Sequence, residues 1–145
     1  MAHAIDAFDL DIHGMTCADL GCNVGGFTDC LLRNGAASVI AIDTGYGVLA
    51  WRLRNDDRVD VRERTNALHA EPPSDGVDLV VVDLGWTPQR HALPAARNWV
   101  KPGGAIVSLV KPHYELTESE RRTHLKDGRL SDDLALDMVT RVQDG

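Results

Sequence analysis

The sequence is poor in basic residues. It has 15 lysines and arginines against 22 aspartates and glutamates, which gives a net charge of −7, and its only lysines are Lys101, Lys111 and Lys126. A protein that binds nucleic acid through general electrostatic attraction carries a basic face. The charge balance argues against this class, so any contact with RNA or DNA must be local or supplied by another component.

Cysteine is also scarce, and long apolar runs are absent. Cys17, Cys22 and Cys30 are odd in number and lack metal-type CxxC spacing, which indicates reduced thiols in a cytoplasmic protein. The histidines are scattered without metal-ligand spacing, so no metal site is predicted. The chain contains no run of about 18 apolar residues and no signal-peptide pattern, so neither membrane insertion nor secretion is indicated.

Short apolar runs alternate with amphipathic segments along the 145 residues. The pattern predicts strands at 16–20, 38–42, 59–61, 77–82 and 105–110. Helices are predicted at 2–12, 27–34, 48–54, 88–99, 118–125 and 132–142, and residues 101–104 form a predicted tight turn. This alternation predicts a single α/β domain with a parallel sheet and helices on both faces.

The stretch from Ala18 to Thr28, ADLGCNVGGFT, lies between a predicted strand and a predicted helix. Its glycines, Gly21, Gly25 and Gly26, allow a sharp turn and leave space for a ligand. The amide hydrogens at the start of the helix can bind the polar end of a nucleotide-like cofactor. Glycine turns also close ordinary strand–helix corners, so this interpretation depends on the other strand ends.

Polar residues follow the later strands: Asp43, Asn66, Asp83 and Lys111. Because ligands of parallel sheets bind at the carboxyl ends of the strands, we expect these residues to share one site. Asp43 lies 24 residues after Asp19, close to the spacing at which a carboxylate accepts hydrogen bonds from ribose hydroxyls. The alternative for Asp43 is a turn aspartate before Gly45.

Two details favour S-adenosyl-L-methionine over a dinucleotide. The spacing Gly21-x-x-x-Gly25-Gly26 departs from the GxGxxG pattern of dinucleotide sites, which makes a nucleotide-dependent oxidoreductase the weaker alternative. Asp19, at the end of the first strand, suits the ammonium and sulfonium of S-adenosyl-L-methionine and would repel a pyrophosphate. A bond to the following helix N-terminus is the other interpretation of Asp19.

Together the motifs resemble the FtsJ-like ribose 2′-O-methyltransferases, and within them the TlyA or haemolysin A-type branch. The resemblance covers residues 2–115 and rests on these stretches: DLGCNVGGFT, AIDTGYGVLAWRLRND, ERTNA, LVVVDLGW, KPGG and LVKPHYE. It implies a Rossmann-like methyltransferase fold with S-adenosyl-L-methionine as methyl donor and S-adenosyl-L-homocysteine as product. It also implies ribosomal RNA as the substrate.

The resemblance assigns the methionine end of the cofactor to Gly21, Gly25 and Phe27, its ribose to Asp43, and its sulfonium to Asp83. Asn66 and Ala67 would lie beside the adenine. The complete set of expected cofactor-binding residues is Asp19, Gly21, Cys22, Asn23, Gly25, Gly26, Phe27, Asp43, Thr44, Asn66, Ala67 and Asp83.

Asp83 and Lys111 match two members of the Lys-Asp-Lys-Glu catalytic set of this family. A ribose 2′-hydroxyl is a poor nucleophile and needs a base or a positioned partner in line with the methyl-bearing sulfur. A lysine can act as this base when burial or nearby cations lower its pKa. The alternatives are a surface lysine at a strand end and a turn aspartate before Gly85.

The other two catalytic members have no counterpart, because the first lysine precedes the segment matching Ala2 to Phe8 and the glutamate belongs to a later strand. Glu115 is too close to Lys111 to replace that glutamate. We therefore expect residues 1–145 to form a single truncated methyltransferase domain that lacks the last strands and the S4-like RNA-binding domain. The alternative is a catalytically incomplete cofactor-binding or interaction module of the same fold.

Without later strands, the fifth strand would be a free sheet edge, which predicts a possible homodimer. Trp51 and Trp99 fall on predicted helices and are expected in the core, whereas Trp86 is the better candidate for a wall of the ligand site. No cationic amphipathic segment supports the membrane lysis that the haemolysin name suggests.

Overall fold

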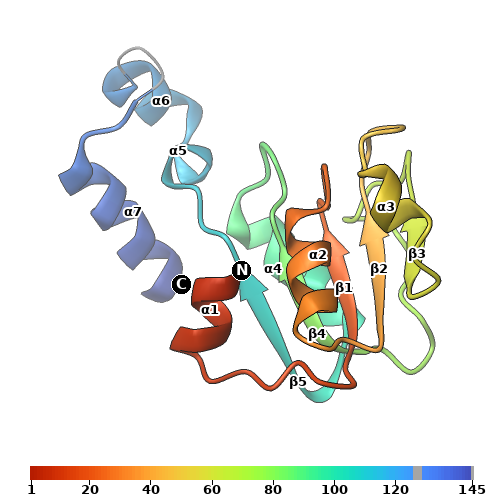
Figure 1. Ribbon diagram of the computed structural model, residues 1–145. Coiled ribbons are helices and arrows are strands. Elements are labelled where there is room, and N and C mark those ends of the chain that lie inside the picture. Colours follow the sequence, from red (N-terminus) through yellow and green to blue (C-terminus); the bar gives the residue numbers. More distant parts are fainter. Residues whose placement is uncertain (126–128, 145) are drawn as a thin grey trace.

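A parallel sheet with β1 at its centre organises the fold. The computed structural model describes residues 1–125 and 129–144 (Figure 1). Within them the strands are β1 (Thr16–Leu20), β2 (Ser38–Ile42), β3 (Val59–Arg62), β4 (Val77–Val82) and β5 (Val100–Ser108), in the order β3-β2-β1-β4-β5. Since β2 lies on one side of β1 and β4 on the other, the strand order reverses beside β1. The predicted parallel α/β architecture is confirmed.

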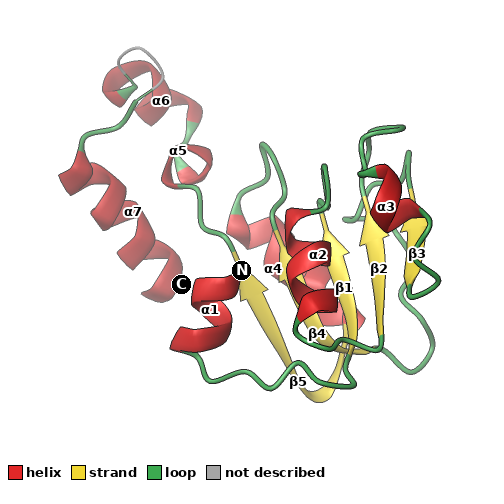
Figure 2. Ribbon diagram, in the orientation of Figure 1, coloured by secondary structure: helices red, strands yellow, loops and turns green. Residues whose placement is uncertain are grey.

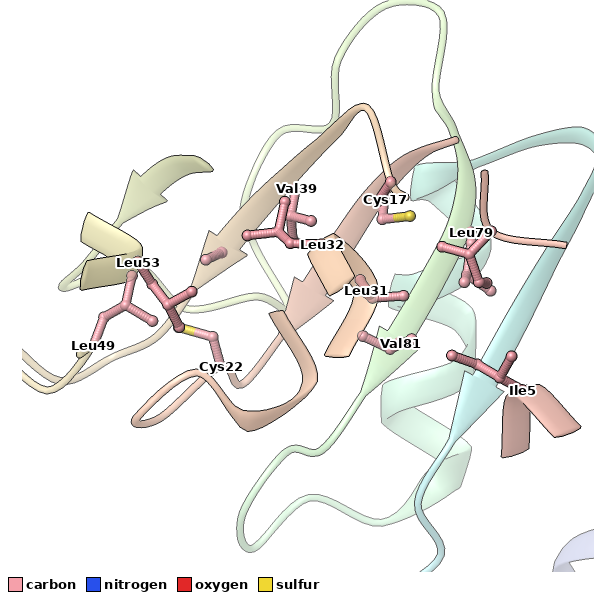
Figure 3. Packing of buried hydrophobic residues seen from close by; sticks show 13 residues of the cluster. Ile5, Cys17, Cys22, Leu31, Leu32, Val39, Leu49, Leu53, Leu79 and Val81 are labelled. Atoms are coloured by element: carbon pink, nitrogen blue, oxygen red, sulfur yellow. The ribbon is translucent and has the colours of Figure 1, made fainter. Parts of the chain in front are cut away.

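Helices cover both faces of the sheet (Figure 2). On one face, α1 (Ala2–Ala7) and α2 (Gly26–Arg33) bury Ile5, Leu31 and Leu32 against strand residues such as Val39 and Val81 (Figure 3). On the other face, α4 (Gln89–Trp99) packs its Ala92, Ala96 and Trp99 against the remaining strand side chains. The β-branched strands β2 and β4 are therefore largely buried on both faces.

The C-terminal part adds three helices beyond β5: α5 (Pro112–Glu115), α6 (Glu118–His124) and α7 (Asp132–Asp144). Thr117 and Glu120 form a capping box at the start of α6, and Arg141 of α7 pairs with Glu120 at 3.0 Å. Figure 1 shows these helices set to one side of the sheet. No helix among the described residues is both long and apolar enough to span a bilayer.

Several predicted boundaries differ from the structure. The helix predicted at 2–12 ends at Ala7, and the one at 48–54 is reduced to α3 (Trp51–Arg54) because residues 43–50 form a loop. The predicted turn at 101–104 is a bulge within β5, since Val100 pairs with Val77 and Ala105 with Leu79. The helix α5 was not predicted.

The prediction of a buried Trp51 was wrong, whereas that for Trp99 is confirmed. Trp99 is 1% exposed, but Trp51 is 76% exposed. A helix of four residues can bury only one side, and in α3 this side belongs to Leu53, which is 3% exposed. Trp51 at its first position therefore faces solvent.

Candidate functional site

A cavity of about 460 Å³ opens at the carboxyl ends of the strands, beside the reversal of strand order. Eight of the residues expected at the site line it: Gly21, Asn23, Asp43, Thr44, Asn66, Ala67, Asp83 and Lys111. The lining also includes neighbours that had not been singled out: Ile42, Thr65, Leu68, Leu84, Gly85 and Thr87. Trp86, the candidate for a wall of the ligand site, also lines the cavity. One cavity therefore collects polar groups that follow all five strands.

Cys22, Gly25, Gly26 and Phe27 lie outside this lining. Cys22 is buried with Leu49 and Leu53 in the α1/α2 core (Figure 3), and burial raises the pKa of its thiol to about 12. Phe27 packs against the same core. The glycine turn thus has one side that faces the cavity and one that faces the core. The spacing of its residues in the sequence does not show which residue lies on which side.

Asp19 also lies outside the lining, fully buried beneath the turn. Its Oδ2 accepts hydrogen bonds from the backbone N–H of Thr28 at 2.9 Å and from the Thr28 hydroxyl at 2.7 Å. This matches the interpretation of Asp19 as a partner of the α2 N-terminus. Its Oδ1 is buried without a hydrogen-bond partner among the described residues. Burial raises the pKa of Asp19 to about 6, with a further contribution from the charges of Asp83 and Asp43.

The raised pKa of Asp19 makes folding stability depend on pH. Because the folded state holds this proton up to about pH 6 and the unfolded state loses it near pH 4, the Asp19 contribution to the free energy of unfolding falls as pH rises between these values. The fall is up to about 3 kcal/mol. Asp19→Asn keeps an acceptor for Thr28 and removes the charge, so its stability relative to wild type should increase with pH in urea titrations. A difference that is constant from pH 4 to pH 7 would contradict this assignment.

Asp43 holds two loops together at the edge of the cavity. Its Oδ2 accepts a hydrogen bond from the Asn23 N–H of the β1–α2 turn, and its Oδ1 accepts one from the Gly45 N–H, both at 2.8 Å. A carboxylate has about four acceptor sites, so both oxygens keep capacity for ligand hydroxyls. Asp43 thus stabilises a turn, as one of its two interpretations predicts, and also lies at a position suited to a ribose.

Asp83 and Lys111 form an ion pair at the ends of β4 and β5. The side chains of Lys111 and Asp83 are 26% and 31% exposed, so the pair is reachable from the cavity that both residues line. Aromatic rings lie beside it: the Lys111 Nζ is 5.5 Å from the ring centroid of Tyr114, which is 5.1 Å from that of Trp86. Tyr114 was not singled out in the sequence, although it lies within the LVKPHYE stretch.

Glu115 bonds to the start of α4. Its Oε1 accepts a hydrogen bond from the Gln89 N–H at 2.9 Å, which caps the start of α4. The Gln89 side chain is buried and bonds to Ser108 of β5 and to the Leu109 carbonyl. Glu115 therefore links α5 to the start of α4, consistent with its exclusion from the catalytic set.

Gly21 is required by a close approach of two strand ends. Its φ is +92°, and a Cβ at this position would lie 2.5 Å from the Asp83 carbonyl oxygen. Because a backbone carbonyl cannot move aside cheaply, Gly21→Ala should lower the free energy of unfolding by about 2–4 kcal/mol. Gly26→Ala is the matched control, since no atom lies within 4 Å of its Cβ position. Equal urea midpoints for the two variants would contradict this account.

Comparisons with known proteins identify relatives of this chain. The model of the FtsJ-like methyltransferase family matches residues 1–129. TlyA of Mycobacterium tuberculosis, a 16S/23S rRNA (cytidine-2′-O)-methyltransferase, is 47% identical over 119 residues, which cover 81% of this chain and 44% of TlyA. The chain thus spans less than half the length of this relative.

Two solved structures share the fold. A hemolysin-type protein from Lactococcus lactis is 30% identical with a TM-score of 0.89, over 99% of this chain and 69% of that one. An S-adenosylmethionine-dependent methyltransferase from Mesorhizobium loti is 21% identical with a TM-score of 0.65, over 79% of this chain and 55% of that one. The fold is Rossmann-like, as expected.

Proposed function

The chain belongs to the FtsJ-like methyltransferase family, and from this premise we propose that it transfers a methyl group from S-adenosyl-L-methionine to a ribose 2′-hydroxyl of ribosomal RNA. TlyA of Mycobacterium tuberculosis carries out this class of reaction on rRNA. The observation that carries the proposal is that Asp43 and the Asp83–Lys111 ion pair line one cavity at the reversal of strand order.

The cavity suits the proposed cofactor. Its volume of about 460 Å³ lies in the range of small-molecule sites. Among its lining residues Asp43 and Asp83 are acidic and Lys111 is basic, so the lining has an excess of one negative charge. Such a site favours a cationic ligand and disfavours the pyrophosphate of a dinucleotide. This supports S-adenosyl-L-methionine over NAD.

Several lining residues have a role in this proposal. Asp43 would accept hydrogen bonds from the ribose hydroxyls of the cofactor, and Asn66 and Ala67 would border its adenine. Gly21 and Asn23 would border the methionine end, with Asp83 near the sulfonium. When bound, S-adenosyl-L-methionine supplies an electrophilic methyl group and becomes S-adenosyl-L-homocysteine.

Lys111 and Asp83 would act on the RNA hydroxyl. The Lys111 Nζ would hold the 2′-hydroxyl in position beside the methyl-bearing sulfur and, in its deprotonated form, would receive the hydroxyl proton. The Asp83 carboxylate orients Lys111 and stabilises the ammonium that forms. Trp86 and Tyr114 would flank the RNA near this pair.

Methyl transfer from labelled S-adenosyl-L-methionine to ribosomal RNA tests the proposal. We expect label in a 2′-O-methylated nucleoside after the RNA is digested. A second candidate, a cofactor-binding module without catalysis, is favoured by the orientation of Glu115 toward α4, which leaves Asp83 and Lys111 as the matched catalytic members. Binding of S-adenosyl-L-homocysteine without transfer to rRNA or intact ribosomal subunits would select this candidate.

We also propose that the protein works in the cytoplasm, where its rRNA substrate is found, and that it forms a homodimer through the edge of its sheet. β5 is the outermost strand of the described sheet on that side. An outer strand offers backbone N–H and carbonyl groups to a second copy. Sedimentation at micromolar concentration should give the mass of a dimer, and the mass of a monomer would contradict this part of the proposal.

A further inference from the structure

The exposed Trp51 follows a residue that is bonded to the glycine turn of the cavity. The Ala50 N–H, which precedes it, donates a hydrogen bond to the Val24 carbonyl at 3.1 Å. Val24 is 60% exposed and follows Asn23, which lines the cavity. The α3 patch, defined here as Val24, Trp51, Arg52 and Arg33, therefore extends from the glycine turn of the cavity, at Val24, to the last residue of α2, Arg33. An exposed cluster of this kind marks an interaction surface more often than an isolated apolar residue does.

The structure anchors the backbone on which Trp51 lies. Leu49 and Leu53, on either side of it in sequence, are buried against the glycine turn. The Trp51 carbonyl accepts a hydrogen bond from the Asn55 side-chain amide at 2.7 Å, which closes the short helix. A large aromatic ring on an anchored element loses little conformational entropy when it binds a partner.

The α3 patch carries an excess of positive charge. Arg33 and Arg52 both pair with the carboxylate of Asp29, so two guanidinium groups share one negative charge. Hydrogen bonds from these arginines lower the pKa of Asp29, which keeps it ionised at neutral pH. Both arginines remain more than half exposed. In a chain with a net charge of −7, this local excess favours an anionic partner.

We propose that the α3 patch binds an unpaired nucleotide of the RNA next to the one that enters the cavity. Trp51 would stack on its base, and Arg52 and Arg33 would contact the adjoining phosphates. An aromatic face interleaved with arginines is the chemistry that recognises single-stranded RNA. This inference rests on the proposed RNA substrate and places part of the RNA contact outside the catalytic cavity.

RNA binding by Trp51 variants tests this inference. With the chain saturated with S-adenosyl-L-homocysteine, Trp51→Ala should bind a short single-stranded oligoribonucleotide about tenfold more weakly than wild type, and Trp51→Phe should retain most of the affinity. The affinity for S-adenosyl-L-homocysteine and the urea midpoint should not change. Leu136→Ala, which removes another exposed apolar side chain, on α7, is the matched control and should bind RNA like wild type.

Fluorescence and salt dependence give independent measurements. In a Trp86→Phe background Trp51 is the exposed tryptophan, because Trp99 is buried, and the oligoribonucleotide should quench its emission. Arg52→Gln should reduce the slope of log affinity against log salt by about 1.

Unchanged RNA affinity in Trp51→Ala, with no quenching, would contradict RNA binding by the α3 patch and leave the proposed function intact. If Trp51→Ala weakens binding to a protein partner but not to RNA, RNA binding by the α3 patch is contradicted as well. A wild-type chain that binds S-adenosyl-L-homocysteine but no RNA would overturn the RNA substrate itself.

Discussion

Lys111→Ala is expected to lower the rate of methyl transfer to ribosomal RNA at least 100-fold, while the affinity for S-adenosyl-L-homocysteine stays within about twofold. Lys111 lies at the cavity, ion-paired with Asp83, where it can reach a bound hydroxyl. Its loss removes the group that positions the nucleophile and receives its proton, and leaves the residues around Asp43 in place. Single-turnover transfer and calorimetry measure the two quantities separately.

The chain supplies a matched control for this substitution. Lys101 forms an ion pair with Asp78 between the same two strands, β4 and β5, at their opposite end. Hydrogen bonds from Lys101 and Thr16 lower the pKa of Asp78 to about 2, so this pair is a structural one. Lys101→Ala should leave transfer nearly unchanged. If Lys111→Ala transfers methyl groups as fast as Lys101→Ala does, the proposed mechanism is wrong even though the family is right.

Asp43→Ala should weaken the binding of S-adenosyl-L-homocysteine about 100-fold. Hydrogen bonds to a charged acceptor contribute about 1.5–3 kcal/mol each, and the proposed ribose contact uses two hydroxyls. The substitution also removes the acceptor for the Asn23 and Gly45 N–H groups, so Asp43→Asn is needed as a second variant that keeps the shape and one acceptor oxygen. We expect Asp43→Asn to fall between wild type and Asp43→Ala in calorimetric titrations.

Glu63 provides the control for loop damage. Its Oε1 accepts a hydrogen bond from the Gly47 N–H at 2.8 Å in the same loop, but Glu63 does not line the cavity. Glu63→Gln should therefore bind the cofactor product within about threefold of wild type. If Glu63→Gln and Asp43→Asn lose affinity equally, the role of Asp43 is to hold the loop, and the ribose contact is refuted.

The sequence predicts the strands and the residues at their carboxyl ends better than it predicts the loops. Runs such as residues 38–42 and 77–82 form strands as expected, because they are buried on both faces. Their ends bring Asp43 and Asp83 to one cavity, since parallel strands end at the same edge. The α/β class and most of the candidate site follow from this regularity.

Other features depend on which side of the backbone faces the ligand, and local spacing does not show that. Asp19 and Asp43 are both carboxylates at strand ends, yet Asp19 is buried with Thr28 while Asp43 lines the cavity. Trp51 fits a helical pattern, but the helix is too short to bury it. The hydrogen bonds to Thr28 at the start of α2 bury Asp19, and the packing of Leu49 and Leu53 against Gly25 leaves Trp51 in solvent.

A crystal structure of the chain with S-adenosyl-L-homocysteine tests the central claim most directly. The account predicts one molecule of this compound in the cavity at the carboxyl ends of the strands, with its ribose hydroxyls on the Asp43 carboxylate and its sulfur near Asp83. An empty cavity at saturating ligand, or an Asp43 carboxylate turned toward bulk water with the ligand bound elsewhere, would contradict it.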